Sequence, residues 1–323
     1  SGRFANVTGL SACFRCPAGF VQSQTGQSAC THCLVGTYID VPGQAACLQC
    51  AAGTATSVNA SVGCAQCLRG YFQNLPGQAS CKPCVVGTSS NIPAALSCTN
   101  CASGKFANKT AMTQCTDCFS GSYQSLPGKS VCTLCEPGRF GQVPGLSDCT
   151  PCASGHFTAA NGTVLCPLCP AGKAQLLNGQ TRCDNCTVGR FTSVDGKAQC
   201  TDCAPGTATN RSGSTICGDC SMGYFQDLSA QGLCKPCPAG TFNLNTGRSI
   251  CSQCTPGTAS IAIGRTTICP DCVSGRYQSA AGSTGCLLCP VGTENPTTGV
   301  TACTSCAPGK FANQNGTVNC GQC

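Results

Sequence analysis

Cysteines are the residues of this sequence whose type and spacing could do chemistry, and they occur as CxxC pairs. The stretch 30–50, CTHCLVGTYIDVPGQAACLQC, holds one pair, thirteen further residues and a second pair. Such pairs bind zinc, exchange electrons in redox enzymes or form disulfides that cross-link the chain. The number and the regularity of the pairs distinguish among these three chemistries.

The 38 cysteines form nineteen CxxC pairs, and the first cysteines of successive pairs lie 17 residues apart, with one step of 18 between 251 and 269. Four-cysteine zinc sites would group the pairs two by two, which nineteen pairs do not allow, and the constant gap leaves no site boundary. A redox pair needs a thiol pKa lowered by a helix start, and no such setting recurs. Disulfides are therefore favoured, with a metal-binding array as the minor alternative.

Composition points to an oxidising compartment. With 38 cysteines in 323 residues, about 12%, the chain exceeds the ~8–10% that marks a disulfide scaffold. It has no Trp and two Met, so residues for a conventional core are scarce. Disulfides form and persist in secreted and cell-surface proteins, where they compensate for a small core. We therefore expect an extracellular location, either secreted or at the cell surface.

Several function classes lack the residues they need. Charged residues make up 9% of the chain, and its net charge of +7 is spread without the basic clusters that bind nucleic acid. No apolar run approaches the ~18–20 residues of a membrane span. The eleven carboxylates form no recurring pair for acid–base work, and His32 and His156 stand where other repeats have other residues. We expect no enzyme, no metal or other cofactor, no nucleic-acid partner and no membrane segment within these residues.

Two glycines mark the backbone of each repeat, counted from the first cysteine of a pair as position 1. Glycine occupies position 7 in every repeat, which indicates a positive φ or a close approach by another backbone segment. A second glycine, at position 14 of most repeats, often follows Pro or Asn, as in tight turns. Alanine replaces it at Ala60, Ala94, Ala111 and Ala230, where we expect a different turn. The pattern predicts small disulfide-rich repeats that are irregular β-hairpins, with almost no helix.

The repeats divide the chain into three parts. Residues 1–12 are a partial repeat, 13–319 are eighteen tandem repeats of 17 or 18 residues, and 320–323 begin a further repeat. An array that runs past both ends of the sequence predicts an elongated, solenoid-like rod of 17-residue units rather than a compact domain. With two strands per hairpin at ~4.8 Å spacing, eighteen hairpins across the axis would extend roughly 180 Å.

Loop entropy favours one disulfide pairing. A bond from the second cysteine of one pair to the first of the next closes a loop of about 15 residues and constrains the unfolded chain by about 3 kcal/mol. Pairing within a CxxC would leave the 13-residue segments free, and linking like cysteines of neighbouring pairs would leave one pair over. The predicted bonds are Cys16–Cys30, Cys33–Cys47, Cys50–Cys64, Cys67–Cys81 and onward to Cys306–Cys320, which leaves Cys13 and Cys323 to partners outside the sequence.

Acceptor sequences for N-linked glycans, Asn-x-Ser/Thr, keep a phase in the repeat. Six of these sequons place the asparagine at position 11 or 13, at the hairpin end remote from the cysteine pair. They begin at Asn6, Asn59, Asn108, Asn161, Asn210 and Asn315. We expect glycans at these six; the seventh sequon, at Asn185, lies within a CxxC and does not share their place in the hairpin. The alternative is that they are chance sequons in turns that contain Asn and Thr.

An aromatic residue stands at position 9 in twelve repeats and is never missing from two adjacent ones. This predicts a 34-residue alternation, with about half a turn between successive hairpins and an aromatic-rich buried side. The alternative is that each aromatic side chain covers only its own disulfide.

The consensus C-x-x-G-x-[FY]-x(4)-G-x(3)-C-x-x-C is carried best by CLRGYFQNLPGQASCKPC (67–84) and CVSGRYQSAAGSTGCLLC (272–289). It resembles the cysteine-rich repeat of ephrin-receptor-like and growth-factor-receptor-like regions, and is similar to the single-disulfide modules of tumour-necrosis-factor receptors. The resemblance covers the whole chain and implies an extracellular module. Two functions compete: a structural glycoprotein that self-associates as the rod of a filament, surface appendage or coat, and the repeat stalk or ectodomain of a receptor or adhesion protein.

Overall fold

The computed structural model describes residues 1–323 as a succession of β-hairpins without a helix. Every sheet is a two-stranded ribbon in which one strand pairs antiparallel with the next along the chain. Each strand is two residues long. Two further hairpins are held by single bridges, His156 to Leu168 and Thr258 to Asp271. The predicted fold class, disulfide-rich irregular hairpins, is confirmed.

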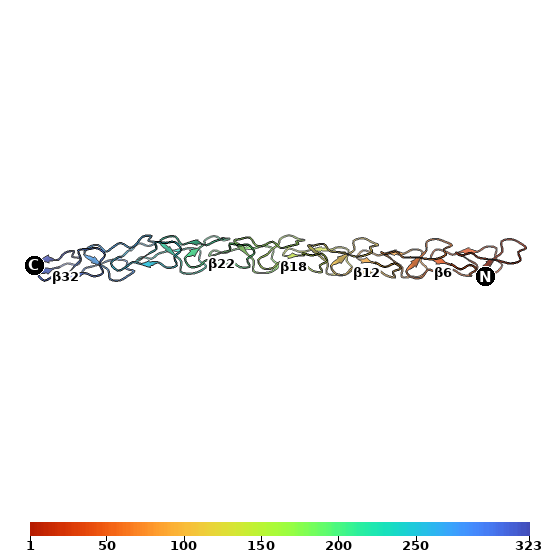
Figure 1. The fold of residues 1–323 in the computed structure, drawn as a ribbon, viewed down its shortest axis with the longest axis horizontal. Helices are drawn as coiled ribbons and strands as arrows, with labels where there is room; N and C mark the ends of the chain where they lie inside the picture. The colour runs from red at the N-terminus through yellow and green to blue at the C-terminus, as the bar shows by residue number, and fades with distance from the viewer. The chain divides into compact units, whose positions relative to one another are not determined.

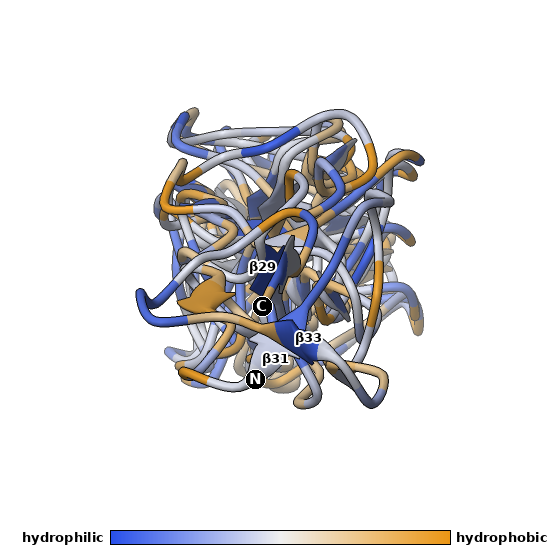
Figure 2. Ribbon diagram, turned by 90° about the vertical axis from the view of Figure 1, so that its left-hand side faces the viewer, coloured by the Kyte–Doolittle hydropathy of each residue, from blue (hydrophilic) through white to orange (hydrophobic).

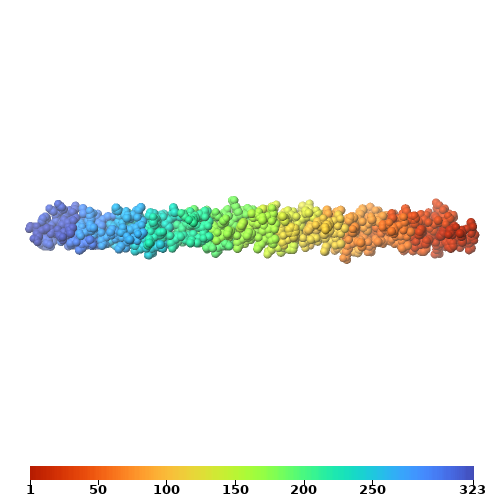
Figure 3. All heavy atoms as spheres, turned by 90° about the horizontal axis from the view of Figure 1, so that it is seen from above, coloured from red at the N-terminus to blue at the C-terminus, as the bar shows by residue number.

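The chain divides into two blocks. The first consists of residues 1–152 and 158–166, and the second of residues 153–157 and 167–323. Within each block the hairpins follow one another in chain order, as the colour sequence shows (Figures 1 and 3).

The strands of the first block are β1 (Arg3–Phe4), β2 (Phe14–Arg15), β3 (Phe20–Val21), β4 (Thr31–His32), β5 (Thr37–Tyr38), β6 (Leu48–Gln49), β7 (Thr54–Ala55), β8 (Ala65–Gln66), β9 (Tyr71–Phe72), β10 (Lys82–Pro83), β11 (Thr88–Ser89), β12 (Thr99–Asn100), β13 (Lys105–Phe106), β14 (Thr116–Asp117), β15 (Ser122–Tyr123), β16 (Thr133–Leu134), β17 (Arg139–Phe140) and β18 (Thr150–Pro151).

Those of the second block are β19 (Lys173–Ala174), β20 (Asp184–Asn185), β21 (Arg190–Phe191), β22 (Thr201–Asp202), β23 (Thr207–Ala208), β24 (Gly218–Asp219), β25 (Tyr224–Phe225), β26 (Lys235–Pro236), β27 (Thr241–Phe242), β28 (Ser252–Gln253), β29 (Arg276–Tyr277), β30 (Leu287–Leu288), β31 (Thr293–Glu294), β32 (Thr304–Ser305), β33 (Lys310–Phe311) and β34 (Gly321–Gln322).

A disulfide closes each complete hairpin. The bonds join the second cysteine of one pair to the first of the next, from Cys16–Cys30 and Cys33–Cys47 through Cys50–Cys64 and Cys67–Cys81 to Cys306–Cys320. Cys13 and Cys323 are free and exposed. The second cysteine of nearly every pair is buried, whereas large aliphatic residues are mostly exposed. Sulfur therefore occupies much of the interior that aliphatic side chains fill in ordinary domains.

The hairpin that begins at Gly70 shows how the strands are held. β9 pairs with β10 in a register that sets Phe72 opposite Lys82. The pairing is extended at its base, where the amide of Cys84 donates to the carbonyl of Gly70 at 2.8 Å. The amide of Tyr71 also donates to the carbonyl of Leu68 at 3.0 Å, which closes a turn between the cysteine and the first strand.

Backbone hydrogen bonds also tie this hairpin to the next repeat. The amide of Gly70 donates to the carbonyl of Ser90 at 2.8 Å, and the amide of Ala94 donates to the carbonyl of Cys67, also at 2.8 Å. The same bonds recur along each block; Gly172 donates to Thr192 in the second, for example. Main-chain groups that two-residue strands leave unpaired are thus satisfied by the neighbouring repeat.

The glycine at position 7 also contacts the second repeat along. A Cβ placed on Gly70 would lie 2.2 Å from the carbonyl oxygen of Ala111, which belongs to the turn two repeats later. The φ of Gly70 is +84°, in the left-handed region. A side chain at this position is therefore excluded twice, by the backbone conformation and by the close approach. This accounts for the glycine in every repeat.

The expectation of a different turn where alanine replaces the second glycine is wrong. Ala60, Ala94, Ala111 and Ala230 have φ between 53° and 59°, the same left-handed conformation as the glycines at position 14. The amide at this position donates to the preceding repeat, and its carbonyl packs on a glycine two repeats back. These two contacts hold alanine in a conformation that costs about 1–2 kcal/mol for an L-residue.

The two glycine positions provide a matched test. In Gly36→Ala the new Cβ would lie 2.2 Å from the carbonyl of Gly77, so the turn two repeats later must move. In Gly77→Ala the Cβ meets only the flexible Gln49 side chain, at 3.3 Å, and alanine already occupies equivalent turns. We expect Gly36→Ala to be secreted poorly and to be cleaved by protease between residues 36 and 80, with Gly77→Ala close to wild type. Equal protease resistance in the two variants would contradict the close contact.

Candidate interaction surface

In most hairpins a polar residue, usually buried, opens the loop directly after the first strand. At this place, position 10, the side chain of Gln73 is 1% exposed. Its Nε2 donates to the carbonyl of Ser80 at 2.8 Å, and its Oε1 accepts from the amide of Leu75 at 3.2 Å. The amide group thus joins the two ends of the loop and satisfies main-chain groups that the hairpin leaves unpaired.

The same pair of hydrogen bonds recurs at every third repeat. It is formed by Gln22, Gln73, Gln124, Gln175, Gln226 and Gln278. These glutamines are 51 residues apart, or 52 across the longer repeat. Sequence reasoning from the cysteines and aromatics missed this period, although the glutamine spacing could have revealed it.

The three-repeat period sorts the loops into three rows, and each row is defined here by the residues at position 10 of its loops. The glutamine row contains the six loops just described. The sequon row opens with Ala5, Thr56, Ala107, Thr158, Thr209, Ser260 and Ala312, and the third row with Ile39, Ser90, Gly141, Thr192, Asn243 and Asn295. All six expected glycosylation sites fall in the sequon row. The aromatic residues at position 9 do not follow these rows; nearly all are half-buried beside their own hairpins.

The asparagines of the sequon row are accessible. Asn6, Asn59, Asn108, Asn161, Asn210 and Asn315 are all exposed, in loops between the two strands of a hairpin. In three of these loops a pair of hydroxyl groups takes the place of the glutamine: Thr56 with Ser61, Thr158 with Thr163 at 2.8 Å, and Thr209 with Ser214. Asn185 is also exposed but lies in β20, next to the disulfide-bonded Cys186.

Apolar loop tips are more frequent in the other two rows. Position 12 is Gln24 or Ala280 in two loops of the glutamine row, and Asn245 or Thr297 in two loops of the third row. In their other loops it is apolar: Leu75, Leu126, Leu177 and Leu228 in the glutamine row, and Val41, Ile92, Val143 and Val194 in the third row. These side chains are 50–62% exposed. In the sequon row the same position is mostly small or polar, for example Lys109 and Arg211. The end view shows hydrophobic stretches on the outer loops (Figure 2).

The hydrogen-bonding pattern of the loops repeats with the rows. Strands β6, β12 and β18 each close a third-row hairpin and succeed one another along the first block (Figure 1). The glutamine hydrogen bonds recur at every third repeat, which does not fit an alternation of two.

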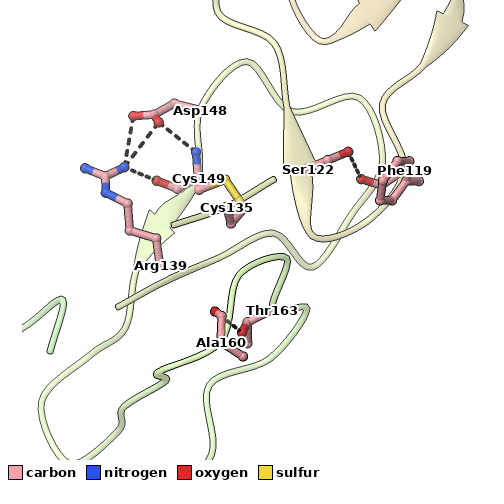
Figure 4. The surroundings of a disulfide bond; sticks show 8 residues. All are labelled: Phe119, Ser122, Cys135, Arg139, Asp148, Cys149, Ala160 and Thr163. Carbon is pink, nitrogen blue, oxygen red and sulfur yellow. Dashed lines mark hydrogen bonds and ion pairs between the residues drawn. A yellow bond between two sulfur atoms is a disulfide. The ribbon is translucent and has the colours of Figure 1, made fainter. Parts of the chain in front are cut away.

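Ion pairs lie on the outside of the hairpins. Figure 4 shows Arg139 Nη1 beside the carboxylate of Asp148, at 3.1 Å, and beside the carbonyl of Cys149 in the Cys135–Cys149 disulfide. Such exposed pairs contribute about 0–1 kcal/mol each.

A second exposed pair joins Asp227 and Lys235. A hydrogen bond from Lys235 lowers the pKa of Asp227, so the attraction between the two side chains is lost as the pH falls through that lowered pKa.

No group of three His, Cys, Asp or Glu side chains that could hold a metal ion occurs in residues 1–323. His32 is exposed in β4, and the Nδ1 atom of His156 lies 3.2 Å from the carbonyl of Ser154. A shallow groove runs beside Asn210 and is lined by Ile216 and Leu233.

No helix of the structure has the length and apolar character needed to span a membrane. The exposed loops are therefore the candidate functional surface.

A comparison with known protein families finds a family whose model matches the repeats. A family model described as "Tyrosine-protein kinase ephrin type A/B receptor-like" matches residues 21–63, 53–101, 211–247 and 260–302. Each match spans between two and three hairpins and includes loops of more than one row. A search of curated proteins finds no significant match to the chain.

The buried glutamine gives a local stability test. In Gln73→Leu the carbonyl of Ser80 and the amide of Leu75 lose their partner, and an unpaired buried group costs about 1–3 kcal/mol. We expect hydrogen exchange in residues 74–80 to become at least about tenfold faster. Gln66→Leu, at an exposed site in β8, is the matched control and leaves exchange unchanged. Equal exchange in both variants would show that the glutamine does not hold the loop.

Proposed function

We propose that this chain, whose ephrin-receptor-like cysteine-rich repeats indicate an extracellular module, is a structural glycoprotein. In this proposal it forms the rod of a filament, surface appendage or coat, with N-linked glycans on its loops. Repeats of this family are a receptor-like module rather than a catalytic fold. The disulfides agree with a secreted or cell-surface location.

The main support for a structural role is the linkage between successive hairpins. Each repeat donates backbone hydrogen bonds to the next, as Gly70 does to Ser90, and packs a glycine on the turn two repeats later. Disulfides close the hairpins but do not connect distant parts of the chain. Contacts of this local kind extend an array by repetition, which is how solenoid proteins grow.

A receptor or adhesion stalk is the second candidate, and the family match favours it. Both functions use an extended extracellular array, and they differ in what the array does. A stalk holds a separate ligand-binding domain at a distance, whereas a filament or coat protein associates with copies of itself. Electron microscopy of native material distinguishes the two, because only the structural protein is expected in long assemblies.

Small-angle scattering of the secreted chain tests the extended shape that both functions require. A rod of roughly 180 Å, from two strands at ~4.8 Å per repeat, has a radius of gyration of about 50 Å. A compact chain of this length would give about 20 Å. We expect the larger value at dilute concentration in oxidising buffer, and the loss of the rod-like scattering profile after reduction of the disulfides. A radius near 20 Å in the oxidised protein would contradict the proposed function.

A further inference from the structure

The three loop rows differ in the chemistry that they present to solvent. Asparagines in sequons within the hairpin loops are confined to the sequon row, and apolar residues at position 12 are more frequent in the other two rows, from Val41 to Leu228, although Val7 and Val58 are exposed at that position in the sequon row. Between residues 41 and 228, leucine recurs every 51 residues in the glutamine row and valine or isoleucine every 51 in the third row; the remaining loops of these rows have Gln24, Asn245, Ala280 and Thr297 at this position. Apolar side chains so regularly exposed form an extended surface that is typical of an interaction site.

We propose that within each block the glutamine and third rows form a face that binds a second copy of this chain side by side, with the sequon row directed away from the contact. The inference rests on the proposed function, because it takes the chain to be extracellular and glycosylated. It adds which loops make the contact and why they lack glycans.

Matching periods favour a second copy as the partner. Each apolar tip is a single side chain, so stable binding requires many tips to be buried in register. A second copy supplies tips at the same 51-residue spacing, so two copies side by side can repeat one contact from Val41 to Val143 in the first block and from Leu177 to Leu228 in the second. A compact partner without this period would cover only a few neighbouring tips.

The charges of these loops permit the contact. Residues at positions 10–17 of the two rows include four acidic and four basic side chains. The acidic ones are Asp40, Asp148, Asp195 and Asp227, and the basic ones are Lys129, Arg182, Lys197 and Arg248. Their sum is zero, whereas the charged residues in the sequon-row loops, Lys109, Arg211 and Arg265, are all basic. Two copies therefore meet without net repulsion on this face.

The chain offers single substitutions that would add a glycan to this face. Pro93→Thr turns the exposed Asn91, in the third row, into a sequon. Threonine is tolerated at that turn position, since it occurs there at Thr110 and Thr246. Gln180→Thr does the same for Asn178 in the glutamine row and reproduces the Asn-Gly-Thr of 161–163.

A matched control adds a glycan to the sequon row instead. The loop of residues 260–268 is the member of that row without a sequon, and Ile261 and Ile263 are exposed there. Ile261→Asn together with Ile263→Thr creates one. All variants are secreted as the full chain; glycopeptide mass spectrometry measures occupancy, and a count of free thiols verifies the disulfides.

The readout is the dissociation constant of the dimer, from analytical ultracentrifugation. We expect Pro93→Thr and Gln180→Thr each to weaken association at least tenfold when glycosylated, enzymatic deglycosylation to restore it, and the control to match wild type. Ile92→Lys, at a position where the sequon row has Lys109, should weaken it without any glycan. Glycosylated variants that associate like wild type, or a control that is equally impaired, would overturn the proposal. An extended wild-type chain that stays monomeric would also refute this face while leaving the extended shape intact.

Discussion

The structure depends on the contact between the glycine at position 7 and the turn two repeats later. At Gly70 the carbonyl of Ala111 occupies the space that any side chain would need. A disulfide holds one hairpin closed, but it does not determine how that hairpin sits on the next. Hydrogen bonds to the first neighbour and the glycine contact to the second supply this information. Because the same contacts recur within each block, the repeats stack in a regular manner without a conventional core.

Polar groups stabilise the interior to an unusual degree. Buried cystines replace aliphatic packing, and the residue that opens each loop is usually polar, as with Gln73 or Thr192. These side chains are hydrogen-bonded to the loop main chain, so they are not left unpaired. Since the interior has little room for large side chains, leucine, isoleucine and valine remain outside. The hairpin architecture thus leaves exposed the apolar side chains on which the proposed contact between two copies rests.

The sequence predicted the fold class because its main determinants are local. Cysteine spacing, the glycine at position 7 and the turn dipeptides act within one repeat, and the hairpins form accordingly. The turns at Ala60 and Ala111 were predicted wrongly, since their conformation is set by other repeats rather than by local propensity. The buried glutamines were missed because position 10 reads as an ordinary polar loop residue. The three-row pattern is present in the sequence, but its meaning depends on which positions are buried and which are exposed.

The central claim is that hairpins stack with a three-repeat period that confines glycans to one row. Electron cryomicroscopy of the native, glycosylated protein tests it most directly, because both the hairpins and the glycan density can be located. The account predicts that hairpins three repeats apart face the same direction and that glycan density appears along the sequon row alone. Hairpins alternating between two sides, with glycan density on both, would contradict it.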